Sequence, residues 1–148
     1  MSLTTAPVFT LKELVTFEEL AANYPLLQLL NPHLSQADYE EMLVHMLQHD
    51  YKQVAVLNER KEIIGLSGYW IGTKIYSGKY LEMDNVIVLP SYRSQGIGKI
   101  LCHWMEEKAK AESCKCIMLD AYVVNKDAHR FYFREGFVIL GFHMLKNL

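Results

Sequence analysis

The first part of the chain has the pattern of one short strand followed by helices. Residues 8–14 are mostly apolar and can form a strand. Thr16 and Glu19 have the spacing of a capping box, so we expect a helix to open there and to end or bend near Pro25. Apolar residues recur at helical spacing after Ser35, which predicts a second helix.

From residue 52 onward the pattern changes to runs typical of strands. Residues 52–58 and 62–72 are rich in β-branched and aromatic residues, and the polar turn between them predicts a hairpin. A turn at 77–79 leads into a long strand over 80–90. Apolar residues at helical spacing then predict a helix over 97–113.

The last part of the chain alternates strand and helix patterns. We expect a strand over 115–124, a short helix over 125–136 that Gly136 stops, and an extended strand-like segment over 137–148. The strand–helix–strand order over 80–124 has the form of a parallel crossover, whereas the earlier strands read as antiparallel. The fold class is therefore α/β, with a mixed sheet and helices on both of its faces.

Composition and charge exclude several classes of protein. The chain has 148 residues, of which 51% are hydrophobic and 22% charged, so we expect one soluble domain over residues 1–148. A net charge of −2 provides no basic stripe, and no apolar run reaches about 18 residues, so neither nucleic acid nor a membrane is an expected partner. No signal-peptide pattern is present, and three cysteines make neither a disulfide framework nor a metal cluster, which favours a cytoplasmic protein without a metal.

The stretch Tyr92–Lys99, YRSQGIGK, places two glycines between a strand and a helix. A helix start exposes unpaired N–H groups, and glycines let an anion approach the backbone closely. The stretch can therefore hold a phosphate, or it can be only a tight turn before a helix. Arg93 stands where a P-loop needs its first glycine, and Leu101 stands at the third glycine of a Rossmann fingerprint, so both of these nucleotide motifs are absent.

Two longer segments carry a specific resemblance. The segment VIVLPSYRSQGIGKIL resembles the acyl-CoA signature of the GNAT superfamily of N-acetyltransferases, and NKDAHRFYFREGF, which begins at Asn125, resembles a helix motif of the same superfamily. The order of elements is similar along almost the whole chain. The resemblance implies a mostly antiparallel, twisted sheet of six to seven strands, in which a central parallel pair splays apart.

By this resemblance the cosubstrate is acetyl-CoA, with its pyrophosphate on the N–H groups from Arg93 to Lys99. The pantetheine arm would lie between the strands that end near Val88 and Asn125, paired with backbone groups of Ile87 and Val88. The N–H of Val88 would also polarise the thioester carbonyl. The residues that the resemblance implies in cosubstrate binding are Ile87, Val88, Arg93, Ser94, Gln95, Gly96, Ile97, Gly98, Lys99, Asn125, Ala128 and Tyr132.

The implied chemistry is attack of a neutral amine on the thioester, with loss of CoA thiolate. Tyr132 matches the tyrosine of the family and would donate a hydrogen bond to the leaving sulfur. Glu82 and Asp84 lie two apart on one predicted strand, so they share a face and are candidates for a base or an amine anchor. A carboxylate near pKa 4 is a poor base for an amine near 10, so the role needs a raised pKa, a water relay or a purely electrostatic action.

The acceptor is less well defined than the donor. Carboxylates at positions 82, 84 and 120 favour a small cationic amine. A protein N-terminus or lysine is an alternative acceptor, and a non-catalytic module that binds acyl-CoA is an alternative function, although intact Asp84 and Tyr132 argue against it. Many relatives in this superfamily dimerise, so the resemblance leaves both a monomer and a homodimer open.

Overall fold

The computed structural model describes residues 5–148, which form two compact units: a first unit that ends at Met118 and a second unit over Leu119–Leu148. The elements up to the boundary are β1 (Thr10–Leu14), α1 (Phe17–Ala21), α2 (Tyr24–Leu30), α3 (Gln36–Leu47), β2 (Lys52–Leu57), β3 (Ile63–Lys74), β4 (Gly78–Val88), the short 3₁₀ helix η1 (Pro90–Tyr92), α4 (Ile97–Ala111) and β5 (Cys116–Leu119). The second unit contains α5 (Lys126–Arg134).

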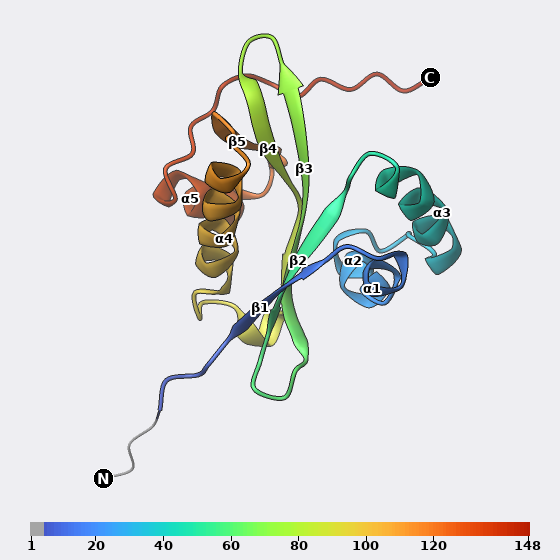
Figure 1. Cartoon of the computed structure of the whole chain (residues 1–148), viewed down its shortest axis with the longest axis vertical. Helices are drawn as coiled ribbons and strands as arrows, with labels where there is room; N and C mark the ends of the chain where they lie inside the picture. The colour runs from blue at the N-terminus through green and yellow to red at the C-terminus, as the bar shows by residue number, and fades with distance from the viewer. Residues whose placement is uncertain (1–4) are drawn as a thin grey trace. The chain divides into compact units, whose positions relative to one another are not determined.

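The strands form one sheet in the order β1-β2-β3-β4-β5 (Figure 1). The first four strands pair antiparallel in sequence, as hairpin patterns predict. β5 lies parallel to β4, next to the point where the Lys115 N–H donates to the Lys79 carbonyl at 2.7 Å. The predicted mixed, mostly antiparallel sheet with one parallel pair is thus confirmed.

The predicted number of six to seven strands is wrong, because the described residues form five. The strand expected over 115–124 ends at Leu119, and residues 122–125 turn back, with the Asn125 N–H donating to the Tyr122 carbonyl at 2.9 Å. Residues 137–148 are not assigned to a strand. An apolar, β-branched pattern describes side chains that suit a sheet, but a strand forms only where a neighbour accepts its backbone hydrogen bonds.

The helix starts follow the capping signals in the sequence. Thr16 and Glu19 form the predicted capping box, and the Ser35 side chain accepts a hydrogen bond from the Asp38 N–H. The first helix, expected to end or bend near Pro25, ends at Ala21, and a second short helix, α2, begins at Tyr24. Pro25 lies in the first turn of α2, where its missing N–H costs no helical hydrogen bond.

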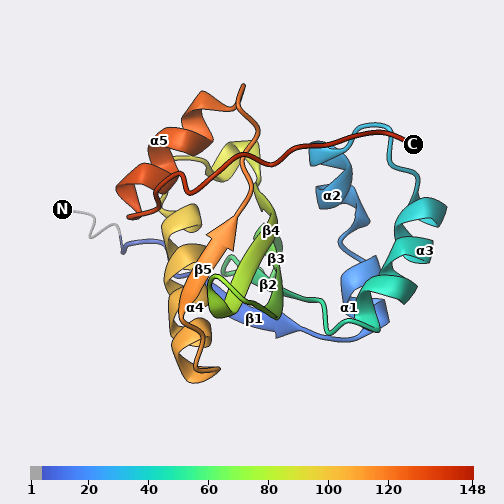
Figure 2. The ribbon, with the colours of Figure 1, turned by 90° about the horizontal axis from the view of Figure 1, so that it is seen from above.

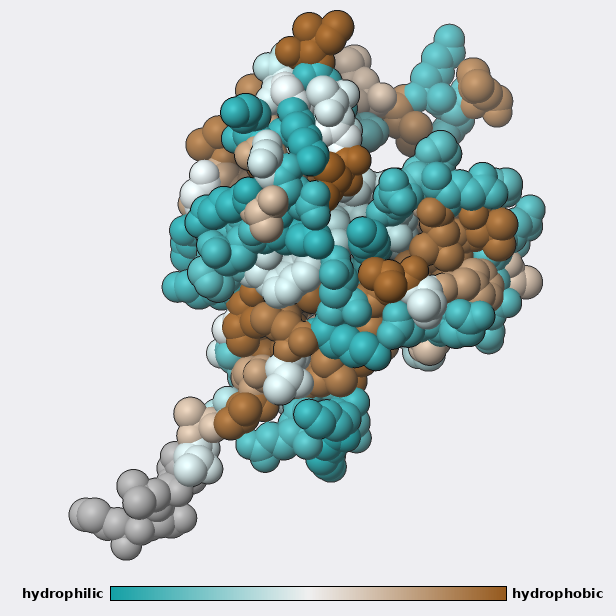
Figure 3. Space-filling model, in the orientation of Figure 1, coloured by the Kyte–Doolittle hydropathy of each residue, from teal (hydrophilic) through white to brown (hydrophobic). Residues whose placement is uncertain are grey.

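Helices cover both faces of the sheet within the first unit (Figure 2). On one face, α1, α2 and α3 pack over a cluster of buried side chains, namely Leu14, Leu20, Leu27, Tyr39, Leu43, Tyr51, Ala55, Leu66 and Ile87. On the other face, Ile97 of α4 approaches the sheet so closely that a Cβ on Gly65 would lie 2.5 Å from Ile97 Cγ2. The outer surface of the α1–α3 layer is mixed in polarity, with apolar patches among hydrophilic side chains (Figure 3).

Candidate active site

The turn between β4 and α4 has the geometry of an anion site; we call residues 93–99 the donor turn. Ser94 and Gly96 have φ values of 62° and 81°, in the left-handed region, and these two residues bring the chain round to the start of α4. Nothing lies within 4 Å of a Cβ added to Gly96, so the space beside the turn is open. α4 is 15 residues long, so its first N–H groups and its dipole favour a negative charge at this end.

Side chains of the donor turn leave that space available to a ligand. Arg93 and Lys99 are exposed, whereas Ile97 is buried under the sheet and fixes the first turn of α4. The predicted cosubstrate residues from Arg93 to Lys99 are therefore gathered at one helix start, with two cationic side chains at its edges.

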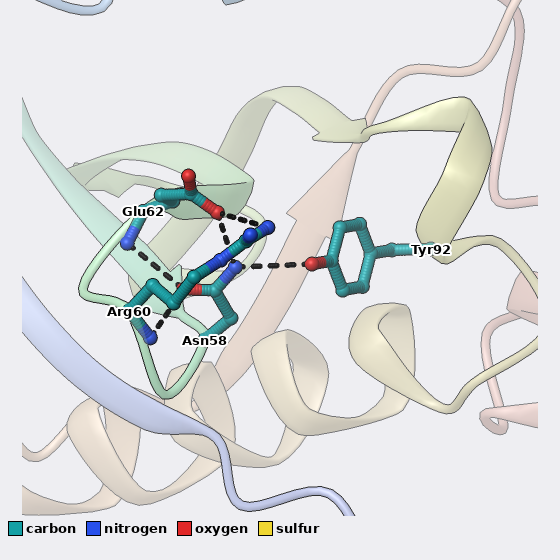
Figure 4. A network of polar contacts seen from close by, with 4 residues as sticks. All are labelled: Asn58, Arg60, Glu62 and Tyr92. Atoms are coloured by element: carbon teal, nitrogen blue, oxygen red, sulfur yellow. Dashed lines mark hydrogen bonds and ion pairs between the residues drawn. The ribbon is translucent and has the colours of Figure 1, made fainter.

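A polar network anchors the chain just before the donor turn (Figure 4). Asn58 Nδ2 donates to Tyr92 Oη at 3.0 Å and to Glu62 Oε2 at 2.7 Å. Asn58 Oδ1 accepts from the N–H groups of Arg60 and Glu62 at 2.9 and 3.0 Å. The network joins the β2–β3 turn to η1. Asn58 and Tyr92 lie far apart in the sequence, so no local pattern predicts their hydrogen bond.

The end of β4 presents backbone groups away from β3. The Leu89 N–H donates to the Ile64 carbonyl at 2.9 Å, and Gly65 pairs with Val88. Because successive residues of an antiparallel strand direct their backbone groups to opposite sides, the N–H and C=O of Val88 point away from β3, while those of Ile87 point toward it. Of the two residues predicted to pair with pantetheine, Val88 has the suitable orientation.

Glu82 and Asp84 share one face of β4, as predicted, and we call them together with Trp70 the acid face. Trp70 lies opposite Glu82 in the β3–β4 ladder. Its indole Nε1–H donates to Asp84 Oδ2 at 3.2 Å, and its ring packs on Tyr51 with the ring centroids 4.8 Å apart. Trp70 therefore positions the Asp84 carboxylate, a contact that the sequence analysis missed.

A buried polar network lies beneath the acid face. Gln53 accepts from Asn23 Nδ2 at 2.8 Å and donates to the hydroxyls of Tyr39 and Tyr51 at 3.2 and 3.4 Å. The Tyr51 hydroxyl also accepts from Asn85 Nδ2 at 3.5 Å. Burial raises the pKa of Tyr51, and it raises the pKa of Tyr39 to about 12.

The network surrounds an irregular point of β4. The β3–β4 register shifts between Leu66 and Gly68, where β4 has one residue more than β3, and Asn85 has a φ of 52°. Gly68 leaves room for the Tyr51 phenol, because a Cβ there would lie 2.0 Å from Tyr51 Oη. This β-bulge directly follows Asp84 and re-aims the strand toward Val88.

A cavity of about 520 Å³ opens next to the acid face. We call it the α3–β4 cavity, because residues 48–50 at the end of α3 line one side and Trp70, Ile71, Tyr80 and Glu82 line the other. Glu82 is the one predicted site residue in this lining. The other lining residues come from the segment after α3 and from β3 and β4, and no local pattern reveals that these segments lie side by side.

The second unit holds the other predicted site residues. Asn125 Oδ1 accepts from the Ala128 N–H at 3.1 Å, so the Asn125 side chain caps α5. The Tyr132 ring lies between Phe131 and Phe137, at centroid distances of 5.2 and 5.6 Å. Gly136, with a φ of 90°, follows the helix end, as predicted.

Asp120 has a partner inside the second unit. His143 Nδ1 lies 2.9 Å from Asp120 Oδ2, so this carboxylate, which we had counted toward a cationic acceptor, makes a local ion pair when His143 is protonated. Within residues 5–148 no group of three or more His, Cys, Asp or Glu side chains could hold a metal ion. Nor does that part of the chain contain a helix long and apolar enough to cross a membrane.

Comparison with known proteins identifies the family. The model of the acetyltransferase (GNAT) family matches residues 16–137. The chain is 29% identical over 130 residues to "Uncharacterized N-acetyltransferase YhdJ" of Bacillus subtilis (strain 168), covering 87% of this chain and 92% of that protein. It is 32% identical over 88 residues to the aminoalkylphosphonate N-acetyltransferase of Salmonella typhimurium, covering 59% of this chain and 57% of that protein.

The fold is also that of solved acetyltransferases. The structure of aminoglycoside N-acetyltransferase AAC(6')-Iy in complex with CoA covers 99% of this chain and 99% of its own, with a TM-score of 0.83 and 15% identity. At this identity the likeness shows the fold alone. The family match is decisive: the chain belongs to the GNAT family of acetyltransferases, and it is an acyltransferase of the N-acetyltransferase type.

Proposed function

We propose that the protein transfers the acetyl group of acetyl-CoA to a primary amine of a small molecule, by direct attack in a ternary complex. The observation that carries the proposal is the donor turn, which offers a helix start and an open, glycine-lined backbone to an anion. Acetyl-CoA suits this site, because its pyrophosphate would accept hydrogen bonds from the N–H groups at residues 93–99 while Arg93 and Lys99 balance its charge.

In the proposed reaction the lone pair of the amine nitrogen attacks the thioester carbon. The new C–N bond forms, the C–S bond breaks, and CoA leaves as a thiolate that takes up one proton. The Val88 N–H, turned away from β3, would stabilise the negative charge that develops on the carbonyl oxygen. Tyr132 would donate a hydrogen bond to the leaving sulfur.

Asp84 is the group that we assign to the amine. Its carboxylate is held by Trp70 Nε1 and shares the acid face with Glu82, so it can attract an ammonium ion and receive the proton that the amine releases, directly or through a water molecule. Glu82 is the second candidate for this role. The Salmonella relative named for acetylation of an aminoalkylphosphonate supports a small molecule rather than a protein as the acceptor.

A thermal-shift titration with acetyl-CoA, followed by an amine and peptide panel scored by release of free thiol, tests the proposal. We expect stabilisation by acetyl-CoA and thiol release with small primary amines. Absence of any stabilisation would refute the donor assignment, and turnover restricted to peptides would refute the small-molecule acceptor. Light scattering on the same preparation distinguishes a homodimer from a monomer.

A further inference from the structure

The lining of the α3–β4 cavity is acidic and aromatic. Glu82 and Asp50 supply two carboxylates from opposite sides, and Trp70 and Tyr80 supply two rings. An aromatic face attracts a cation and a carboxylate does so more strongly, so the two kinds of lining favour the same ligand charge. Gln48, His49 and Ile71 complete the lining.

The protein already places one cation on this lining. Lys74 Nζ lies 4.9 Å from the centroid of the Tyr80 ring and 5.9 Å from that of Tyr76. Burial disfavours the charge of this ammonium, but Tyr76, Tyr80 and Glu82 favour it by more, so the pKa of Lys74 is raised. The folded protein therefore already places one positive charge beside Tyr80 and Glu82.

The cavity adjoins the place assigned to the reacting amine. Trp70 lines the cavity with its ring and donates to Asp84 through its Nε1–H, so one side chain borders both places. Glu82 and Asp84 are two residues apart on one strand, which separates them by about 7 Å. An acceptor that reacts beside Asp84 would reach the cavity with a chain only a few bonds long.

We infer that the α3–β4 cavity binds a second cationic group of the acceptor; this inference rests on the proposed N-acetyltransferase function. The preferred substrates would then be small amines with a second positive charge about 7 Å from the reacting nitrogen. Trp70 would hold the face of the cation, Tyr80, whose ring already carries Lys74, would border the apolar linker, and Asp50 and Glu82 would neutralise the ligand charge. Acceptors with a distal anion, such as aminoalkylphosphonates, would be rejected.

Three amines with the same number of carbons separate the effect of charge: cadaverine has a distal ammonium, pentylamine no distal charge and 5-aminovalerate a distal carboxylate. With acetyl-CoA saturating, we expect kcat/KM for cadaverine to exceed that for pentylamine about tenfold, and aminovalerate to be poorer than pentylamine. Equal values for cadaverine and pentylamine, within threefold, would overturn the inference.

Variants locate the effect in the cavity. Asp50→Asn and Tyr80→Leu should each lower the cadaverine-to-pentylamine ratio about threefold to fivefold, because each removes one attraction for the distal charge. Glu41→Gln removes an exposed carboxylate from α3, the helix that precedes Asp50, outside the cavity lining, and should leave the ratio unchanged. If neither cavity variant changed the cadaverine-to-pentylamine ratio, the preference for a distal charge would arise outside the cavity, and the assignment of the cavity as the cation site would be wrong.

A binding measurement separates this inference from the proposed function. Tetramethylammonium is a cation that no acetyltransferase can acetylate, and neopentyl alcohol is a neutral molecule of similar shape. We expect tetramethylammonium to change the Trp70 fluorescence saturably, neopentyl alcohol to have little effect, and Trp70→Phe to abolish the signal. This result combined with no turnover of any amine would refute the proposed function while retaining the cation site. An equal response to both probes, or none to either, would refute the cation site.

Discussion

The donor turn and the acid face lie in the same unit of the protein but are built in different ways. The donor turn consists of seven consecutive residues and uses left-handed backbone at Ser94 and Gly96 to open a helix. The acid face depends on side chains from separate strands, such as Trp70 on β3 and Asp84 on β4, held over a buried network. A site made of backbone can be recognised in a short motif, whereas a site made of side chains depends on the register of the whole sheet.

The comparison is tested most strongly by removing the side chains assigned to proton transfer. Asp84→Asn and Tyr132→Phe should each lower kcat by about 10²–10⁴-fold, because Asp84 is assigned to receive the proton of the amine and Tyr132 to donate a hydrogen bond to the leaving sulfur. Steady-state rates of thiol release at saturating acetyl-CoA measure the effect. Tyr122→Phe, which alters a side chain that is 86% exposed, is the matched control. A loss below threefold in either test variant would refute its assigned role.

Gly68→Ala should damage the acid face through packing. The new Cβ would meet Tyr51 Oη at 2.0 Å, so the phenol must move out of the network that it shares with Gln53 and Asn85. We expect the free energy of unfolding to fall by about 1–3 kcal/mol, measured by urea denaturation. Gly141→Ala, where nothing lies within 4 Å of the added Cβ, is the control and should have no comparable effect. Equal stability of the two variants would show that Tyr51 is not tightly held.

Gly96→Ala should damage the donor turn selectively. A residue with Cβ at a φ of 81° is strained by about 1–2 kcal/mol, and the methyl group points into the open space offered to the pyrophosphate. We expect KM for acetyl-CoA to rise about tenfold while KM for the amine stays within twofold. If the amine KM rose as much as that of acetyl-CoA, the separation between donor turn and acid face would be wrong.

The smallest expected effect is an alkaline loss of stability. The pKa of Tyr39 is raised to about 12 and that of Tyr51 is also raised, so the folded state holds these protons more tightly than the unfolded chain, where tyrosine titrates near 10. The stabilisation is complete below about pH 10 and decreases as the pH rises toward 12. Urea denaturation from pH 8 to 11 should show this slope, and Tyr39→Phe should reduce it more than Tyr76→Phe, which changes an exposed side chain. Identical slopes in the two variants would contradict this origin.

Local signals in the sequence predicted much of the fold. The capping box at Thr16 and the glycine after α5 were both predicted from neighbouring residues, and the structure confirms them. The last predicted strand was wrong because residues 137–148 have strand-like side chains without a strand neighbour in the structure. Whether a segment becomes a strand depends on pairing with residues far away in the sequence, and local patterns do not reveal that pairing.

The candidate site shows the same limit. The shared face of Glu82 and Asp84 follows from the two-residue period of a strand and was predictable. The hydrogen bond from Trp70 to Asp84 was not, because it depends on the register between β3 and β4, which no local pattern specifies. The α3–β4 cavity likewise requires the end of α3 to lie beside β3 and β4.

Initial rates with acetyl-CoA and a reactive amine both varied test the central claim most directly. Direct attack in a ternary complex predicts intersecting lines in double-reciprocal plots, one equivalent of acetylated amine for each free thiol, and no thiol release without the amine. Parallel lines, which indicate an acetylated enzyme, or an absence of amine-dependent thiol release would contradict the account.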